Sequence, residues 1–111
     1  MTMKNIVQNI FTDLAQTFQD EEVFTELLNN QSVKIERVVS TGQITPVENA
    51  YDQIHDEWVI LLAGSAKMWL EHKGDIELNY GDYLFIPAGQ KHRVTFTSNL
   101  PPAVWLAIHI L

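Results

Sequence analysis

One stretch of the chain, GDYLFIPAGQKHRV (81–94), combines two turn sequences, a short apolar run and a histidine. An imidazole can bind a divalent metal or exchange a proton near neutral pH, so His92 is the first candidate for chemistry. Val94 and Phe96 follow at alternate positions, so on a strand they share the face of His92. We therefore predict that His92 begins a strand and points inward. Two roles stay open for His92: a metal ligand on a cavity wall, or only the last polar residue of the loop that leads into the strand.

A second polar stretch, YDQIHDE (51–57), directly precedes a long apolar run. On an unbroken strand Gln53, His55 and Glu57 share one face, whereas a bulge between Gln53 and Glu57 turns His55 outward. The acidic neighbours of His55 also leave open that it is a solvated loop histidine. The chain has no cysteine, so a metal site has to use His, Glu, Asp or Gln.

Short strands must position these residues, because no helical period returns after Ser32. Glycine and proline separate the apolar runs, as at Lys73-Gly74 and Pro101-Pro102. Many short strands at this spacing are typical of an antiparallel sandwich or barrel. The predicted strands are 33–40, 43–48, 51–55, 57–63, 66–72, 75–79, 83–86, 92–97 and 103–110.

The N-terminal region has a different pattern, which predicts helical structure over residues 5–30. Apolar residues recur there at helical spacing, and Asp20 is a candidate N-cap. We predict a helical N-terminal cover over 1–30 and an all-β barrel over 31–111, together forming one structural domain. The first apolar stripe is Ile6, Ile10, Leu14 and Phe18, and the second is Val23, Phe24, Leu27 and Leu28.

The run EWVILLAG (57–64) is apolar on both faces of a strand. Trp58, Ile60 and Leu62 occupy the face opposite Glu57 and need a cover. The N-terminal segment is one candidate cover. A second copy of the chain is the other, and it would make the protein a homodimer.

Composition and charge narrow the partners of this 111-residue chain, whose length suits a single domain. A net charge of −7 without a local cluster of Lys and Arg argues against nucleic acid and anionic membranes. The N-terminal segment carries Asn, Gln and Asp within its apolar pattern, unlike a signal-peptide core or a membrane span. We therefore expect a cytoplasmic protein.

The two polar stretches also resemble a known family. GDYLFIPAGQKH (81–92) has the spacing G-x5-P-x-G-x2-H of the second conserved motif of the cupin family, and EWVILLAG (57–64) matches E-x6-G at the end of the first. Over about residues 33–110 the chain resembles small single-domain cupins of largely unassigned function. The resemblance implies an antiparallel double-stranded β-helix, or jelly-roll barrel, with a divalent metal in its cavity.

The resemblance carries over only part of the family's ligand set. Glu57 and His92 fall on ligand positions, whereas the two histidines of the first motif are replaced by Tyr51 and Gln53. Gln53 still offers a carbonyl oxygen to a hard cation. His55 lies inside the motif's spacer, and with Glu57 and His92 it would complete a two-histidine, one-carboxylate set. Such a set suits Fe(II) with open positions and is also acceptable to Mn, Ni or Zn.

Two further side chains are candidates for ligand binding. Tyr51 is placed to close the mouth of the cavity by hydrogen bonding. Arg37 shares a face with the apolar residues of SVKIERVVS (32–40), which predicts that it points inward, toward Glu57 or toward a ligand carboxylate. The other interpretation places its guanidinium in water at the rim. Alternation does not settle the direction of His109.

The function predicted from these observations is binding of a divalent metal and of a small polar or carboxylate-bearing molecule. An enzyme of this type would be a dioxygenase, an isomerase or a lyase, with the metal polarising a substrate oxygen. The alternatives are a metal-free binding or sensing module and a non-catalytic interaction protein that uses its apolar outer face. The sequence has no nucleophile-elbow serine and no phosphate-binding loop.

Overall fold

The computed structural model describes residues 6–14 and 20–111, which form strands and one short 3-10 helix. The predicted all-β antiparallel fold is confirmed. The elements are β1 (Val23–Asn29), β2 (Val33–Ser40), η2 (Val47–Asn49), β3 (Asp56–Ala63), β4 (Ser65–Leu70), β5 (Gly74–Asn79), β6 (Tyr83–Ile86), β7 (His92–Thr97) and β8 (Ala103–Ile110).

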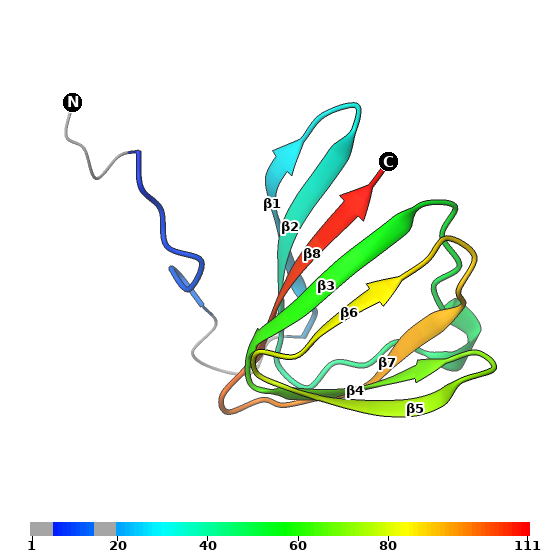
Figure 1. Cartoon of the computed structure of the whole chain (residues 1–111). Coiled ribbons are helices and arrows are strands. Elements are labelled where there is room, and N and C mark those ends of the chain that lie inside the picture. The colour runs from blue at the N-terminus through cyan, green and yellow to red at the C-terminus, as the bar shows by residue number, and fades with distance from the viewer. Residues whose placement is uncertain (1–5, 15–19) are drawn as a thin grey trace.

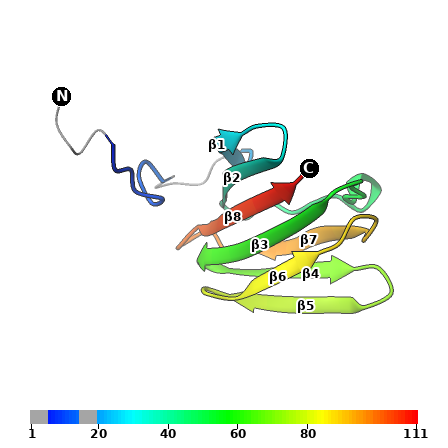
Figure 2. The same cartoon turned by 45° about the horizontal axis from the view of Figure 1, so that its top comes forward.

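Two antiparallel sheets face each other and enclose the core, as Figures 1 and 2 show. The larger sheet has the order β1-β2-β8-β3-β6, and the smaller has the order β5-β4-β7. Alternate residues of each central strand point between the sheets, where apolar side chains exclude water. The most deeply buried members of this core include Val59, Leu61, Ala66, Met68, Leu78, Ile86, Ala103 and Trp105.

The predicted strand bounds hold for β2, β6, β7 and β8, but the strands predicted over 43–48 and 51–55 are wrong. Pro46 lacks an N–H group and interrupts the first of them. The segment crosses the edge of β7 and contacts it at separate points without forming a ladder. Thr45 N donates to Val94 O at 2.8 Å, and Tyr51 forms an isolated bridge with His92.

The predicted helical N-terminal cover is also wrong over the described residues. Residues 6–14 contain turns, and 23–29 form β1, which pairs with β2 in the larger sheet. Phe18, which belongs to the predicted first apolar stripe, lies outside the described part of the chain. A short apolar run is compatible with a helix or with a strand. Here residues 23–29 form a strand because they pair with the otherwise free edge of β2. The barrel therefore extends into the range 1–30, which was expected to be a separate cover.

A bulge in β7 corrects one further expectation. The register with β4 shifts so that Met68 pairs with Val94 while Lys67 pairs with Phe96. The extra residue reverses the side-chain direction between them. Val94 therefore packs against the core, whereas Phe96 is 44% exposed and lies beneath the Lys67 ammonium. The prediction that Phe96 points inward beside His92 is wrong.

The outer face of the larger sheet carries apolar side chains. Trp58 packs against Tyr83 with ring centroids 5.3 Å apart, and Phe85 is 51% exposed nearby on β6. The described N-terminal residues instead contact Arg37 on β2. None of the described residues belongs to a helix long and apolar enough to cross a bilayer.

Replacing Gly64 tests how tightly the two sheets are joined. Gly64 has φ of +78°, and an added Cβ would lie 2.6 Å from Pro102 O and 2.9 Å from Ala103 Cα. Gly64→Ala should lower the free energy of unfolding by about 2–4 kcal/mol, through overpacking and backbone strain. Gly74→Ala is the control, because Gly74 has φ of +94° with open space around it. Equal losses in urea denaturation would contradict the packing argument.

The homodimer stays a prediction, and the outer face gives it a test. Light scattering should report about twice the 12.7 kDa chain mass for the wild type. Phe85→Glu places a charge on that face and should convert the dimer to a monomer, because an unpaired charge in an apolar interface is costly. Phe96→Glu, on the smaller sheet, is the matched control and should stay dimeric. A monomeric wild type at micromolar concentration would rule the prediction out.

Candidate functional site

A cavity of about 100 Å³ opens between the two sheets. Its deep end is apolar, with Val59, Met68 and Trp105 among its lining residues. Its mouth is polar. The polar lining residues are Glu22, Glu36, Tyr51, Gln53, Glu57, His92 and His109.

His92 begins β7 and lies almost fully inside the cavity wall, with 4% of its surface exposed. Its Nδ1 lies 2.9 Å from the carbonyl oxygen of Gln90. A carbonyl can only accept, so Nδ1 carries the hydrogen and Nε2 faces the cavity. The ring also stacks on Tyr51, at 5.3 Å between centroids and 23° between planes. Two contacts thus fix the orientation of the imidazole, and the predicted inward direction of His92 is confirmed.

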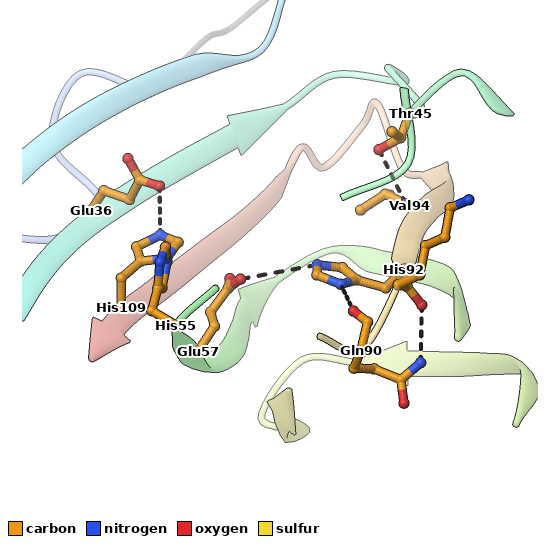
Figure 3. A network of polar contacts seen from close by, with 9 residues as sticks. Glu36, Thr45, His55, Glu57, Gln90, His92, Val94 and His109 are labelled. Atoms are coloured by element: carbon orange, nitrogen blue, oxygen red, sulfur yellow. Dashed lines mark hydrogen bonds and ion pairs between the residues drawn. The ribbon is translucent and has the colours of Figure 1, made fainter. Parts of the chain in front are cut away.

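Glu57 points into the cavity from β3, opposite His92 (Figure 3). Its Oε1 lies 4.0 Å from His92 Nε2, and no hydrogen bond joins its carboxyl group to any described residue. Burial raises the pKa of Glu57, while the nearby His109 and His92 rings offset part of the increase. A buried carboxyl group therefore faces an imidazole nitrogen across a gap.

A second polar chain lies on the other side of Glu57. His109 Nε2 lies 3.0 Å from Glu36 Oε1, and His109 Nδ1 lies 3.0 Å from His55 Nε2. The carboxylate accepts, so Nε2 of His109 is the donor. Antiparallel pairing places His109 of β8 directly beside Glu57 of β3, as Figure 3 shows.

His55 does not stand where an unbroken strand would put it. Residues 52–55 form no ladder, and β3 begins at Asp56. The Pro-x-Gly turn holds the irregular segment, since Gly89 N donates to Gln53 O at 2.8 Å. His55 contacts His109 and is absent from the cavity lining. Of the two alternatives left open for His55, the unbroken strand is therefore wrong, and the backbone before Glu57 is irregular.

Tyr51 and Gln53 both reach the mouth of the cavity, as expected. Burial raises the pKa of Tyr51, and the charges of Glu22, Glu57 and Glu36 raise it further. Gln53 Oε1 is buried without a partner in the described structure. An orphaned acceptor at this position is available to a ligand donor.

Arg37 lies on the opposite face of β2 from the cavity. Its Nη1 donates to the carbonyl oxygens of Ile10 and Thr12, at 2.9 and 2.6 Å. Glu36, its neighbour in sequence, occupies the inward position instead. The prediction that Arg37 points toward Glu57 or a ligand is wrong, because an apolar flank does not tell which side of a two-faced strand is the core.

The metal set implied by the family resemblance does not assemble among the described residues. They contain no group of three His, Asp or Glu side chains arranged to hold an ion. Glu57 and His92 remain 4.0 Å apart, and His55 is engaged by His109. Gln53 adds one neutral oxygen with no partner. These residues do not make the expected ligand shell, and metal binding by them stays a prediction.

Sequence reasoning left out Glu22 and Glu36 and did not settle His109. The information that the sequence lacked for the two residues on strands, Glu36 and His109, is the register between β2 and β8. Pairing of Lys34 with His109, and of Glu36 with Ala107, puts the inward face of β2 at the even-numbered positions. That information lies in the neighbouring strand and not in the alternation of β2 itself.

Comparisons with known proteins agree with this architecture. A crystal structure of a candidate mannose-6-phosphate isomerase from Ralstonia eutropha has 38% identity, covers 94% of this chain and 96% of its own, and superposes with a TM-score of 0.88. A cupin superfamily protein from Desulfitobacterium hafniense has 17% identity over 87% and 84% of the two chains, with a TM-score of 0.73.

An RmlC-like cupin from Methanocaldococcus jannaschii, described as a double-stranded β-helix, shares 17% identity over 83% of this chain and 82% of its own, with a TM-score of 0.69. No curated protein matches the chain. The cupin domain family matches residues 38–109, which include most of the larger sheet and all of the smaller. Two facing sheets, the paired motifs and the family match lead to one conclusion: the chain belongs to the cupin family.

Proposed function

We propose that the barrel cavity binds a small organic molecule and that Glu57 and His92 exchange protons with it. The observation that carries this proposal is the buried Glu57 carboxyl group, which has no hydrogen bond to a described residue. Burial of such a group without partners is costly, and polar groups kept at this cost are concentrated at functional sites.

The His92 ring supports the same proposal. Since Nδ1 donates to Gln90 O, Nε2 is the nitrogen that exchanges protons with the cavity. Glu57, with its raised pKa, holds a proton more readily than an exposed carboxyl group does. One group can therefore remove a proton from a bound molecule while the other returns one.

An isomerisation is one reaction class that such a pair supports without an outside oxidant. A proton leaves one atom of the substrate and returns to another, and nothing is consumed. The name of the Ralstonia eutropha protein, a candidate mannose-6-phosphate isomerase, agrees with that class. A metal-free binding or sensing module is the alternative, favoured by Tyr51 and Gln53 at the positions of the first-motif histidines.

The binding part of the proposal predicts ligands that depend on the cavity. A thermal-shift screen of small metabolites on chelator-treated protein should give stabilising ligands for the wild type. His92→Ala should weaken their binding by about tenfold, as expected for loss of one buried polar contact. His72→Ala is the control, because His72 has 89% of its side chain exposed. The absence of any stabilising ligand would refute the proposal.

Proton exchange predicts a separate result. Ligands with an acidic C–H bond should take up deuterium from D₂O, as measured by proton NMR. Glu57→Gln and His92→Ala should each slow uptake by about 10²–10⁴-fold, the range for a lost general acid or base. Ligand binding without enzyme-dependent exchange would establish the non-catalytic alternative.

Stability should also depend on pH through Glu57. Because the folded pKa of Glu57 is raised above 4.5, the native state binds its proton more tightly than the unfolded state. The contribution of this group is complete below pH 4.5 and is lost as pH rises through the folded pKa. Glu57→Gln should therefore gain about 1–3 kcal/mol in free energy of unfolding over wild type at pH 8, where the wild-type carboxylate is charged and largely desolvated, and little at pH 4. Urea denaturation at both pH values checks the difference, with exposed Glu77→Gln as control.

A further inference from the structure

The side chains that line the cavity include more acidic groups than basic ones. Three carboxyl groups line it, from Glu22, Glu36 and Glu57, whereas Lys and Arg are absent from its lining among the residues that the structure describes. The nearest cation in contact with this set is Lys34, whose Nζ lies 3.7 Å from Glu36 Oε2.

Two of these carboxyl groups accept hydrogen bonds from neighbouring side chains. Glu36 Oε1 accepts a hydrogen bond from His109 Nε2, and Glu22 Oε2 accepts one from Ser40 Oγ at 2.7 Å. Donors that point at a carboxylate stabilise its charged form. Glu57 differs, since it is buried and lacks such donors among the described residues.

The neighbouring carboxylates also affect the pKa of the Tyr51 phenol. After burial, the causes that raise its pKa are the charges of Glu22, Glu57 and Glu36. Glu22, Glu36 and Glu57 line the same cavity as Tyr51, so their carboxylates oppose a further negative charge placed there and stabilise a positive one.

The remaining walls suit an organic cation better than a hydrated ion. Phe24, Tyr51 and Trp105 line the cavity, together with aliphatic side chains such as Val59 and Met68. Aromatic faces attract cations, and apolar walls favour a cation that carries hydrocarbon groups. The cavity of about 100 Å³ limits the ligand to a few heavy atoms.

We infer that the ligand of this cavity is a small organic cation, such as a substituted ammonium compound. The inference rests on the proposed binding function and names its substrate class. Sugar phosphates and simple carboxylates fit the site poorly, because no lining Lys or Arg would pair with their charge. This chain therefore selects a different substrate class from the one in the name of its Ralstonia eutropha relative.

Two molecules of the same shape test the sign of the charge. Choline and 3,3-dimethyl-1-butanol differ in one atom, a quaternary nitrogen in place of a carbon. On chelator-treated protein, calorimetry should find choline bound at least about tenfold more tightly, the difference expected for a partly desolvated cation against aromatic and carboxylate groups. 3,3-Dimethylbutanoate, which is close to both molecules in size, serves as the anionic probe and should bind more weakly than choline.

Charge variants then locate the effect. Glu22→Gln and Glu36→Gln should each weaken choline binding about threefold or more while leaving the alcohol unchanged. Glu77→Gln removes the same charge from an exposed side chain on β5 and should alter neither.

Equal affinities for choline and the alcohol would overturn the inference and leave the proposed binding function standing. Tighter binding of 3,3-dimethylbutanoate than of choline would overturn the inference as well. If no probe binds, the inference fails, and the metabolite screen decides separately whether the cavity binds small molecules at all.

Discussion

The register of β8 between β2 and β3 is the constraint on which the site depends. Antiparallel pairing sets His109 opposite Glu57 on one side and opposite Lys34 on the other. Glu36 then lies two residues further along β2, on the same face. A slip of one residue would turn these side chains away from the cavity. Backbone hydrogen bonding thus gathers two carboxyl groups and an imidazole at one end of the barrel.

The smaller sheet supplies the opposing side of the site through an irregular connection. Tyr51 bridges to His92 at the edge of β7, and Gly89, in the turn between β6 and β7, donates a hydrogen bond to Gln53 O. These contacts hold a polar segment that belongs to no strand, so its side chains reach the mouth from a fixed backbone. The same contacts stack Tyr51 on the His92 ring. The contacts that hold the 51–55 segment therefore also orient the His92 imidazole.

Charge and burial together give the cavity its chemical character. Glu57 stays without a hydrogen bond to any described residue while it faces His92, an arrangement that lowers stability and suits proton transfer. Glu36 accepts a hydrogen bond from His109. Family membership alone does not specify this combination, because the cupin fold supports many unrelated functions. The individual side chains of this chain, with a carboxylate-rich lining and no lining Lys or Arg, favour a cationic ligand.

The sequence by itself determined the all-β class, four strands to the residue and the inward direction of His92, because turn residues and alternation are local properties. Tertiary structure decided the rest. The free edge of β2 made 23–29 a strand, and the β4 register turned Phe96 outward. The pairing of β2 with β8 places Glu36 in the cavity lining and its neighbour Arg37 on the other face of the sheet. Each outcome depends on which backbone lies alongside, and distant parts of the chain supply that backbone.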